Sequence, residues 1–138
     1  MGLTTNAGET QLATLLAYLH PVLHPDPFVF VTLPRDGEIP PNFASLFQEE
    51  EGISLILIQA DADRHRVTYS SVWALITLQL QSSLAAVGLL ATLLPPLAAA
   101  GISVNPVAAF HHDHLFVPWD RRTDALQILS ELERPVGN

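Results

Sequence analysis

Four consecutive residues able to bind metals, His111, His112, Asp113 and His114, form the most conspicuous polar cluster of the sequence. Imidazole nitrogens and carboxylate oxygens are zinc ligands, so a metal-dependent enzyme centred on this cluster is one hypothesis. In an extended strand, however, successive side chains point to opposite faces, so His112 and His114 would share a face and the four residues cannot all converge. The sequence favours a hairpin turn in which the Asp113 carboxylate accepts hydrogen bonds from nearby backbone N–H groups. We therefore predict no metal site and no cofactor.

Two serines, Ser82 and Ser83, stand where an apolar segment gives way to a segment rich in alanine and leucine. A serine nucleophile needs an adjacent base, and no GxSxG motif surrounds this pair. Helix capping is the expected role of the two hydroxyls. The first N–H groups of a helix have no partner inside the helix and attract negative charge, so a small anion could bind at this junction.

Gly88 falls in the first turn of the helix expected over residues 83–99, where glycine costs about 1 kcal/mol relative to alanine. Close packing of the helix on a sheet would explain this glycine, and so would the close approach of a ligand or a partner chain. Pro95 and Pro96 predict a kink or a break inside the helix. Gly101 is a natural residue for its carboxyl end.

The composition narrows the class of protein. Acidic residues outnumber basic ones by 14 to 6, and the net charge of −8 argues against nucleic-acid binding. The absence of cysteine excludes disulfides and thiolate chemistry. Residues 67–110 carry no charge, but serines, glutamines and a proline pair interrupt this run, which argues against a membrane span. We expect a cytoplasmic protein without a signal peptide, which binds neither nucleic acid nor membrane.

Hydrophobic periodicity predicts the secondary structure. Leucines at helical spacing predict a helix over residues 9–19, which His20-Pro21 ends and an extended linker follows. Further along the chain we expect strands at 28–33, 43–49, 53–59, 73–80, 102–110 and 114–118, with helices at 60–66, 83–99 and after Asp120, the residue expected to cap the last helix.

The order of these elements predicts an α+β protein with a ferredoxin-like split β-α-β arrangement. In such a sheet, ordered 4-1-3-2, the second strand lies at an edge, which suits a strand containing Pro106. A hairpin turn, an apolar strand and an Asp-led helix follow one another twice, around residues 51–64 and 111–126. We therefore expect two interlocked lobes, residues 1–66 and 67–138.

The segment ITLQLQSSLAAVGLLATLLPPLAAAGISVNPVAAF resembles the ACT domains, which are amino-acid-binding regulatory modules. SSLAAVGL together with HDHLFVP resembles more closely a group of small bacterial proteins built from two tandem, intertwined ACT-like lobes. The resemblance covers nearly the whole chain, since HPDPFVFVTLP and the EEEGISLIL hairpin also fit it. Departures from the group are Gln81 in place of a common histidine, the pair Pro95–Pro96, and Pro106.

This resemblance implies a ferredoxin-like fold, a homodimer and a bound small-molecule effector, an amino acid. The ligand-binding residues it implies are Ser82, Ser83, Val87, Gly88, Leu89, Asn105, His112 and Asp113. Our first hypothesis is thus a non-catalytic regulatory module, not an enzyme. A structural adaptor for oligomerisation, without a ligand, is the second hypothesis, and the metal-dependent enzyme at residues 111–114 is the third.

Overall fold

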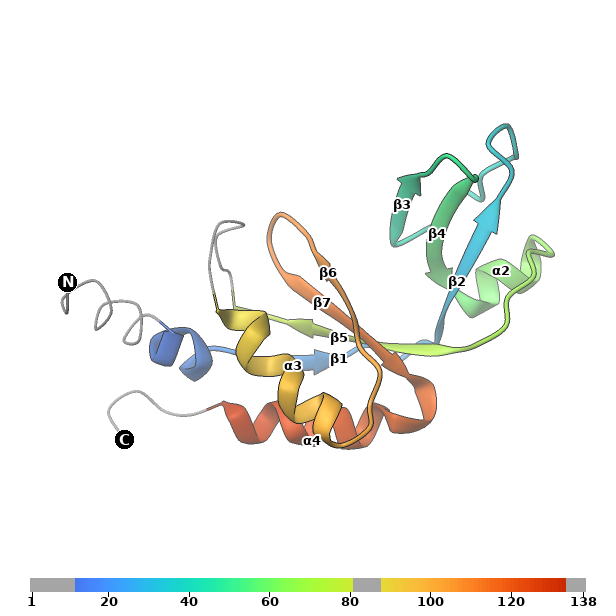
Figure 1. The fold of residues 1–138 in the computed structure, drawn as a ribbon. Helices are drawn as coiled ribbons and strands as arrows, with labels where there is room; N and C mark the ends of the chain where they lie inside the picture. Colours follow the sequence, from blue (N-terminus) through green and yellow to red (C-terminus); the bar gives the residue numbers. More distant parts are fainter. Residues whose placement is uncertain (1–11, 81–87, 134–138) are drawn as a thin grey trace.

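The computed structural model describes residues 12–80 and 88–133, and over these residues the strands form one antiparallel, seven-stranded sheet (Figure 1). The strand order is β3-β4-β2-β5-β7-β6, and β1 pairs with β5 beside β2. The elements are β1 Pro21–Leu23, β2 Phe28–Leu33, β3 Ser45–Gln48, β4 Ile53–Ile58, α2 Gln59–Arg64, β5 Trp73–Leu78, α3 Leu89–Ala99, β6 Asn105–Ala108, β7 Asp113–Pro118, a 3-10 turn Trp119–Arg121 and α4 Arg122–Leu132. The predicted α+β class is confirmed.

The amino-terminal lobe is built on β2, β3 and β4, with α2 packed against one side of them. The run ISLILI is apolar except for Ser54, which suits β4 as the central strand of this lobe, paired with β2 on one side and β3 on the other. The β3–β4 turn closes through hydrogen bonds between Glu49 and Gly52, from N to O in both directions. Val29, Val31, Leu55 and Leu57 meet Ala62 of α2 in the core of this lobe.

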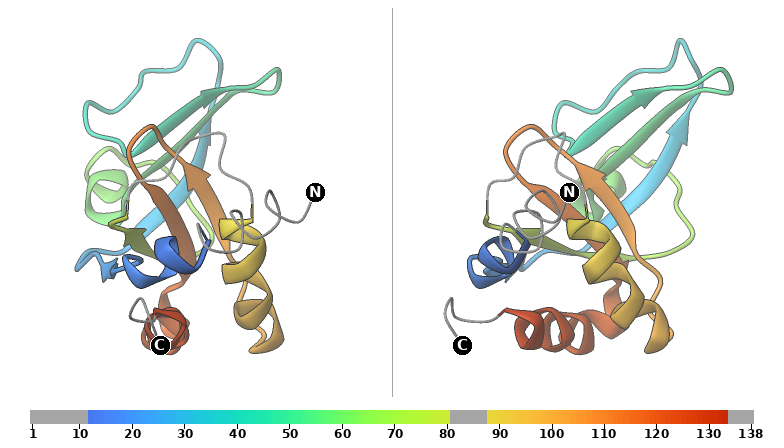
Figure 2. Two further views of the ribbon diagram at one scale, coloured as in Figure 1. Left: turned by 90° about the vertical axis from the view of Figure 1, so that its left-hand side faces the viewer. Right: turned by 60° about the vertical axis from the view of Figure 1, so that its left-hand side comes forward.

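The carboxyl-terminal lobe places α3 and α4 side by side on one face of its sheet, where their side chains share a core with those of β5 and β7 (Figure 1, Figure 2). Its strand order is the expected 4-1-3-2, and β6, which contains Pro106, lies at the edge as predicted. The fourth strand is β1, which comes from the amino-terminal part of the chain and pairs with the carboxyl-terminal end of β5.

Residues 12–23 therefore belong structurally to the carboxyl-terminal lobe. Residues 12–17 are helical, as expected, and Leu19 is fully buried among side chains of β5, β7, α3 and α4. The prediction of an extended linker after His20 is wrong at residues 21–23, because β1 forms three residue pairs with β5 there. The boundary between residues 66 and 67 stays a prediction.

Helix α3 differs from its prediction in two ways. It begins at Leu89, so Gly88 is the residue before the helix and not part of its first turn. It also continues unbroken through Pro95 and Pro96 to Ala99. The predicted cap of the last helix is wrong too, because the 3-10 turn takes up Asp120 and no side chain caps α4, whose N-cap residue is Arg121.

The sheet has two faces of different character. Its helix face carries the residues that pack on α2, α3 and α4. Its open face, the opposite one, carries Phe28, Ile56, Leu75 and Phe116, which pack on one another as the sheet curls. The curl brings Ser45 of β3 and Val107 of β6 to one small cavity of about 80 Å³, so the two edge strands approach each other across the open face.

Candidate functional site

Helix α3 begins directly after a glycine, Gly88. Gly88 has φ +98°, a left-handed conformation that L-residues rarely adopt, and an added Cβ would meet no described atom within 4 Å. The backbone angle, and not close packing, thus accounts for this glycine. Its carbonyl accepts hydrogen bonds from the Thr92 amide (3.0 Å) and hydroxyl (2.9 Å). Among the described residues no side chain caps this helix end, and the first amides of a helix have no partner within the helix.

The β6–β7 hairpin reaches the carboxyl end of β5, close to the start of residues 81–87. The turn is closed by the Ala109 amide, which donates to the His112 carbonyl at 3.1 Å. His112 Nδ1 lies 3.5 Å from the Leu80 carbonyl oxygen. Asp113 is not at a turn position, as the sequence had suggested, because it is the first residue of β7 and pairs with Ala108.

The predicted ligand-binding residues fall into three groups. Ser82, Ser83 and Val87 lie outside the described residues. Gly88, Leu89 and Asp113 are on the side of the helix face, where Leu89 is buried in the core and offers a ligand only its backbone.

Asn105 and His112 belong to the opposite side of the sheet. Asn105 pairs with Phe116, three residues along β6 from the pair that Ala108 forms with Asp113, so it is about 10 Å from the hairpin tip. Since His112 and His114 alternate with Asp113, both histidines lie on the open face, with ring centroids 6.5 Å apart. The structure thus does not bring all the predicted residues together.

His114 lines the small cavity on the open face, together with Ser45 and apolar side chains. Its Nδ1 lies 2.9 Å from the Thr77 hydroxyl of the neighbouring strand. Burial lowers the pKa of the His114 imidazole below its ordinary value of 6.5, and the nearby His112 lowers it further, while Asp113 acts in the opposite direction. The neutral form of His114 is therefore favoured in the folded protein.

A depressed pKa at His114 makes folding stability depend on pH. Below about pH 6.5 the unfolded chain takes up a proton on this residue before the folded chain does, so stability should fall as the pH drops through 6.5 toward 5. We expect His114→Gln to flatten this loss, measured by urea denaturation at several pH values. His65→Gln, at an exposed position, is the matched control for the loss of one imidazole. An equal slope for both variants would contradict the assignment.

The metal hypothesis finds little support in this geometry. Within residues 12–80 and 88–133, no three His, Asp or Glu side chains are grouped so as to hold a metal ion. His111 and His112 have ring centroids 6.4 Å apart, while Asp113 points to the other face.

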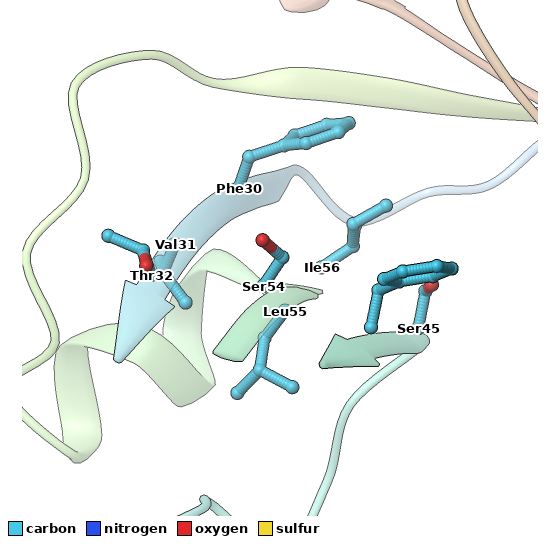
Figure 3. A pocket seen from close by; sticks show the side chains of 8 residues that line it. Phe30, Val31, Thr32, Ser45, Ser54, Leu55 and Ile56 are labelled. Atoms are coloured by element: carbon cyan, nitrogen blue, oxygen red, sulfur yellow. The ribbon is translucent and has the colours of Figure 1, made fainter. Parts of the chain in front are cut away.

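A larger pocket on the open face of the amino-terminal lobe was missed by the sequence analysis. Its volume is about 350 Å³, and Figure 3 shows the side chains that line it. It is lined by Phe30, Val31, Thr32, Ser45, Phe47, Ser54, Leu55 and Ile56. Alternation along FVFVTL and ISLILI puts hydroxyls beside large apolar groups on one face of the sheet. The sequence could predict this pocket only if the register of the three strands were known.

Two family models match the chain, and both describe an ACT domain. One matches residues 7–74 and the other residues 68–131, so together they span nearly the whole chain. No curated protein matches it significantly. None of the helices in the described part of the chain combines the length and the apolar character that crossing a bilayer requires.

Solved structures agree with these matches. A protein of unknown function from Vibrio cholerae, described as a possible transport protein, is 34% identical with a TM-score of 0.80, covering 92% of this chain and 99% of its own. A protein from Agrobacterium tumefaciens is 19% identical with a TM-score of 0.64, covering 80% and 85%. The ligand-free regulatory subunit of aspartate kinase from Thermus thermophilus is 9% identical with a TM-score of 0.62, covering 84% and 97%. The last two show a shared fold.

Proposed function

The chain belongs to the ACT-domain family, and from that premise we propose that it is a non-catalytic regulatory module that binds an amino acid at residues 81–89. The regulatory role matches that of the aspartate kinase subunit with the same fold. The observation that carries the proposal is the amino end of α3, which follows the left-handed Gly88 and is capped by no side chain of the described residues. We further propose that the module works in the cytoplasm as a homodimer.

The two charged groups of an amino acid find complementary groups on the helix-face side of this junction. The amides of Leu89 and the next residues, with the helix dipole, suit a carboxylate. Asp113 lies on the same side and offers a carboxylate to the ligand ammonium group. Ser82 and Ser83 add hydroxyls in this proposal, and His112 and Asn105 lie on the far side of the sheet and contribute less.

The first test is a thermal-shift screen against the twenty amino acids. A ligand that binds only the folded state raises the melting temperature. At a concentration one hundred times its Kd, it adds about 2.7 kcal/mol to the free energy of unfolding. We expect at least one amino acid to do so, and Gly88→Trp to abolish the shift by blocking the helix end. Gly101→Trp is the matched control, because Gly101 also has a left-handed φ (+74°) and open space around it at the other end of α3.

Both tryptophan variants should lose about 1–3 kcal/mol of stability from backbone strain, so a difference between them in ligand response comes from the site alone. Asp113→Asn should weaken the response about tenfold or more, whereas His112→Gln should leave it nearly intact. Absence of a shift with every amino acid, or an equal response of both glycine variants, would sink the proposal.

The adaptor hypothesis is the second candidate, and exposed aromatic side chains favour it. Phe47 is 70% exposed and Phe110 at the hairpin tip is 78% exposed. Large exposed apolar groups often mark contacts with partner chains. Sedimentation of the protein with and without these side chains would show whether they hold subunits together.

A further inference from the structure

We propose a second ligand site, in the 350 Å³ pocket on the open face of the amino-terminal lobe, and we infer that it takes a small organic amine with an aromatic or branched aliphatic body. This site is separate from the α3 junction, because the pocket is built from β2, β3 and β4 alone. The proposal therefore stands or falls independently of amino-acid binding at residues 81–89.

The shape of the pocket follows from the strand register. Phe30 of β2 pairs with Ile56 of β4, which pairs in turn with Ser45 of β3, so these three side chains form one row across the sheet. Figure 3 shows Phe30 and Ile56 on the same side of the strands as the Ser54 hydroxyl, with Leu55 turned to the other side. The pocket volume is within the range of sites that enclose small molecules.

A second row supplies the polar groups. Thr32, Ser54 and Phe47 are opposite one another on the three strands, so two hydroxyls lie next to an exposed aromatic ring. Thr32, Ser45 and Ser54 can each donate or accept a hydrogen bond. The lining thus combines large apolar side chains with three hydroxyls, which suits a ligand that has one polar end.

Glu49 determines which charge the polar end of the ligand should carry. Its carboxylate accepts a hydrogen bond from the Ser54 hydroxyl, which places a negative charge at the polar side of the pocket. None of the lining residues is basic, so a ligand carboxylate or phosphate would find no counter-charge there. An ammonium group, in contrast, would gain a charge-assisted hydrogen bond and the faces of the phenylalanine rings.

The test uses the full-length chain with ¹³C-labelled isoleucine methyl groups and 2-phenylethylamine as the probe. We expect the Ile56 methyl resonance to shift saturably, while that of Ile76, fully buried on the helix face of the other lobe, stays in place. The matched anion, 3-phenylpropionate, should bind at least about tenfold more weakly. Equal binding of the amine and the acid would overturn the inference.

Two matched pairs of variants locate the binding. Glu49→Gln should weaken amine binding about tenfold, whereas Glu50→Gln, which removes the same charge from the same turn, should change it little. Phe47→Ala should also weaken it, and Phe110→Ala, at an equally exposed ring elsewhere, should not. Equal effects within either pair would overturn the site. So would an Ile56 shift that depends on protein concentration without any probe, since a second copy would then occupy the pocket.

Discussion

Replacing Leu19 by alanine is expected to destabilise the protein by about 2–5 kcal/mol, although the residue belongs to the amino-terminal part of the chain. Its side chain is fully buried in the core of the carboxyl-terminal lobe, so truncation would leave a cavity between β5 and the helices. Chemical denaturation should show the loss, and the melting temperature should fall by roughly 10 °C.

The same substitution tests how the lobes interlock. The His20 amide donates a hydrogen bond to the Glu133 carboxylate, and the His20 carbonyl accepts one from the Gln79 amide. The residue after Leu19 is thus bound both to the residue that follows α4 and to the residue that follows β5. Amide exchange in β5 and α4 should therefore accelerate together in Leu19→Ala. Tyr18→Ala, at a neighbouring position that is 65% exposed, should cost less than about 0.5 kcal/mol. A cost below about 1 kcal/mol for Leu19→Ala would mean that residues 12–23 are not part of this core.

The pattern of apolar residues predicted two strands of the amino-terminal lobe. The run FVFVTL is β2 without any error in its ends, and the apolar run after Gly52 is β4. The edge position of β6 followed from Pro106, because a proline removes a backbone donor that a central strand needs. These predictions succeeded because each depended on local chemistry alone.

What escaped prediction depended on the partner of a segment. The three residues of β1 have no strand pattern of their own, and they are extended because β5 has a free edge there. Gly88 marked a functional-looking junction, but its left-handed φ, and hence the start of α3 at Leu89, is not encoded in the spacing of apolar residues. The open-face pocket needs the register of β2, β3 and β4, which one sequence does not supply.

The candidate site shows the same division. The sequence placed Asp113 and His114 in one cluster, yet alternation along β7 puts these two neighbours on opposite faces of the sheet. Asp113 therefore lies on the side of the proposed amino-acid site, and His114 is a half-buried imidazole on the other face, where burial lowers its pKa. The residue types predicted which side chains could bind a ligand. Only the strand register showed which of these side chains lie on the same face of the sheet.

Gly52→Ala is the second substitution from which we expect a large effect, about 2–3 kcal/mol of lost stability. A Cβ at this position would lie 2.4 Å from the Leu33 carbonyl oxygen, and this oxygen belongs to the backbone of β2, so the clash cannot be relieved by a side-chain rotation. Leu33 and Ile53 form the last pair between β2 and β4, and that end of the sheet should separate. Urea denaturation measures the loss.

Two controls separate the clash from other consequences of losing this glycine. Glu50→Ala, in the same turn but exposed, should cost less than about 0.5 kcal/mol. Gly101→Ala, where an added Cβ meets no described atom within 4 Å, should cost only the strain of its backbone angle, about 1 kcal/mol. Because Glu49 and Ser54 flank the displaced turn, Gly52→Ala should also weaken 2-phenylethylamine binding at the open-face pocket. A stability loss no greater than that of Gly101→Ala would mean that β2 and the turn do not meet as closely as the structure shows.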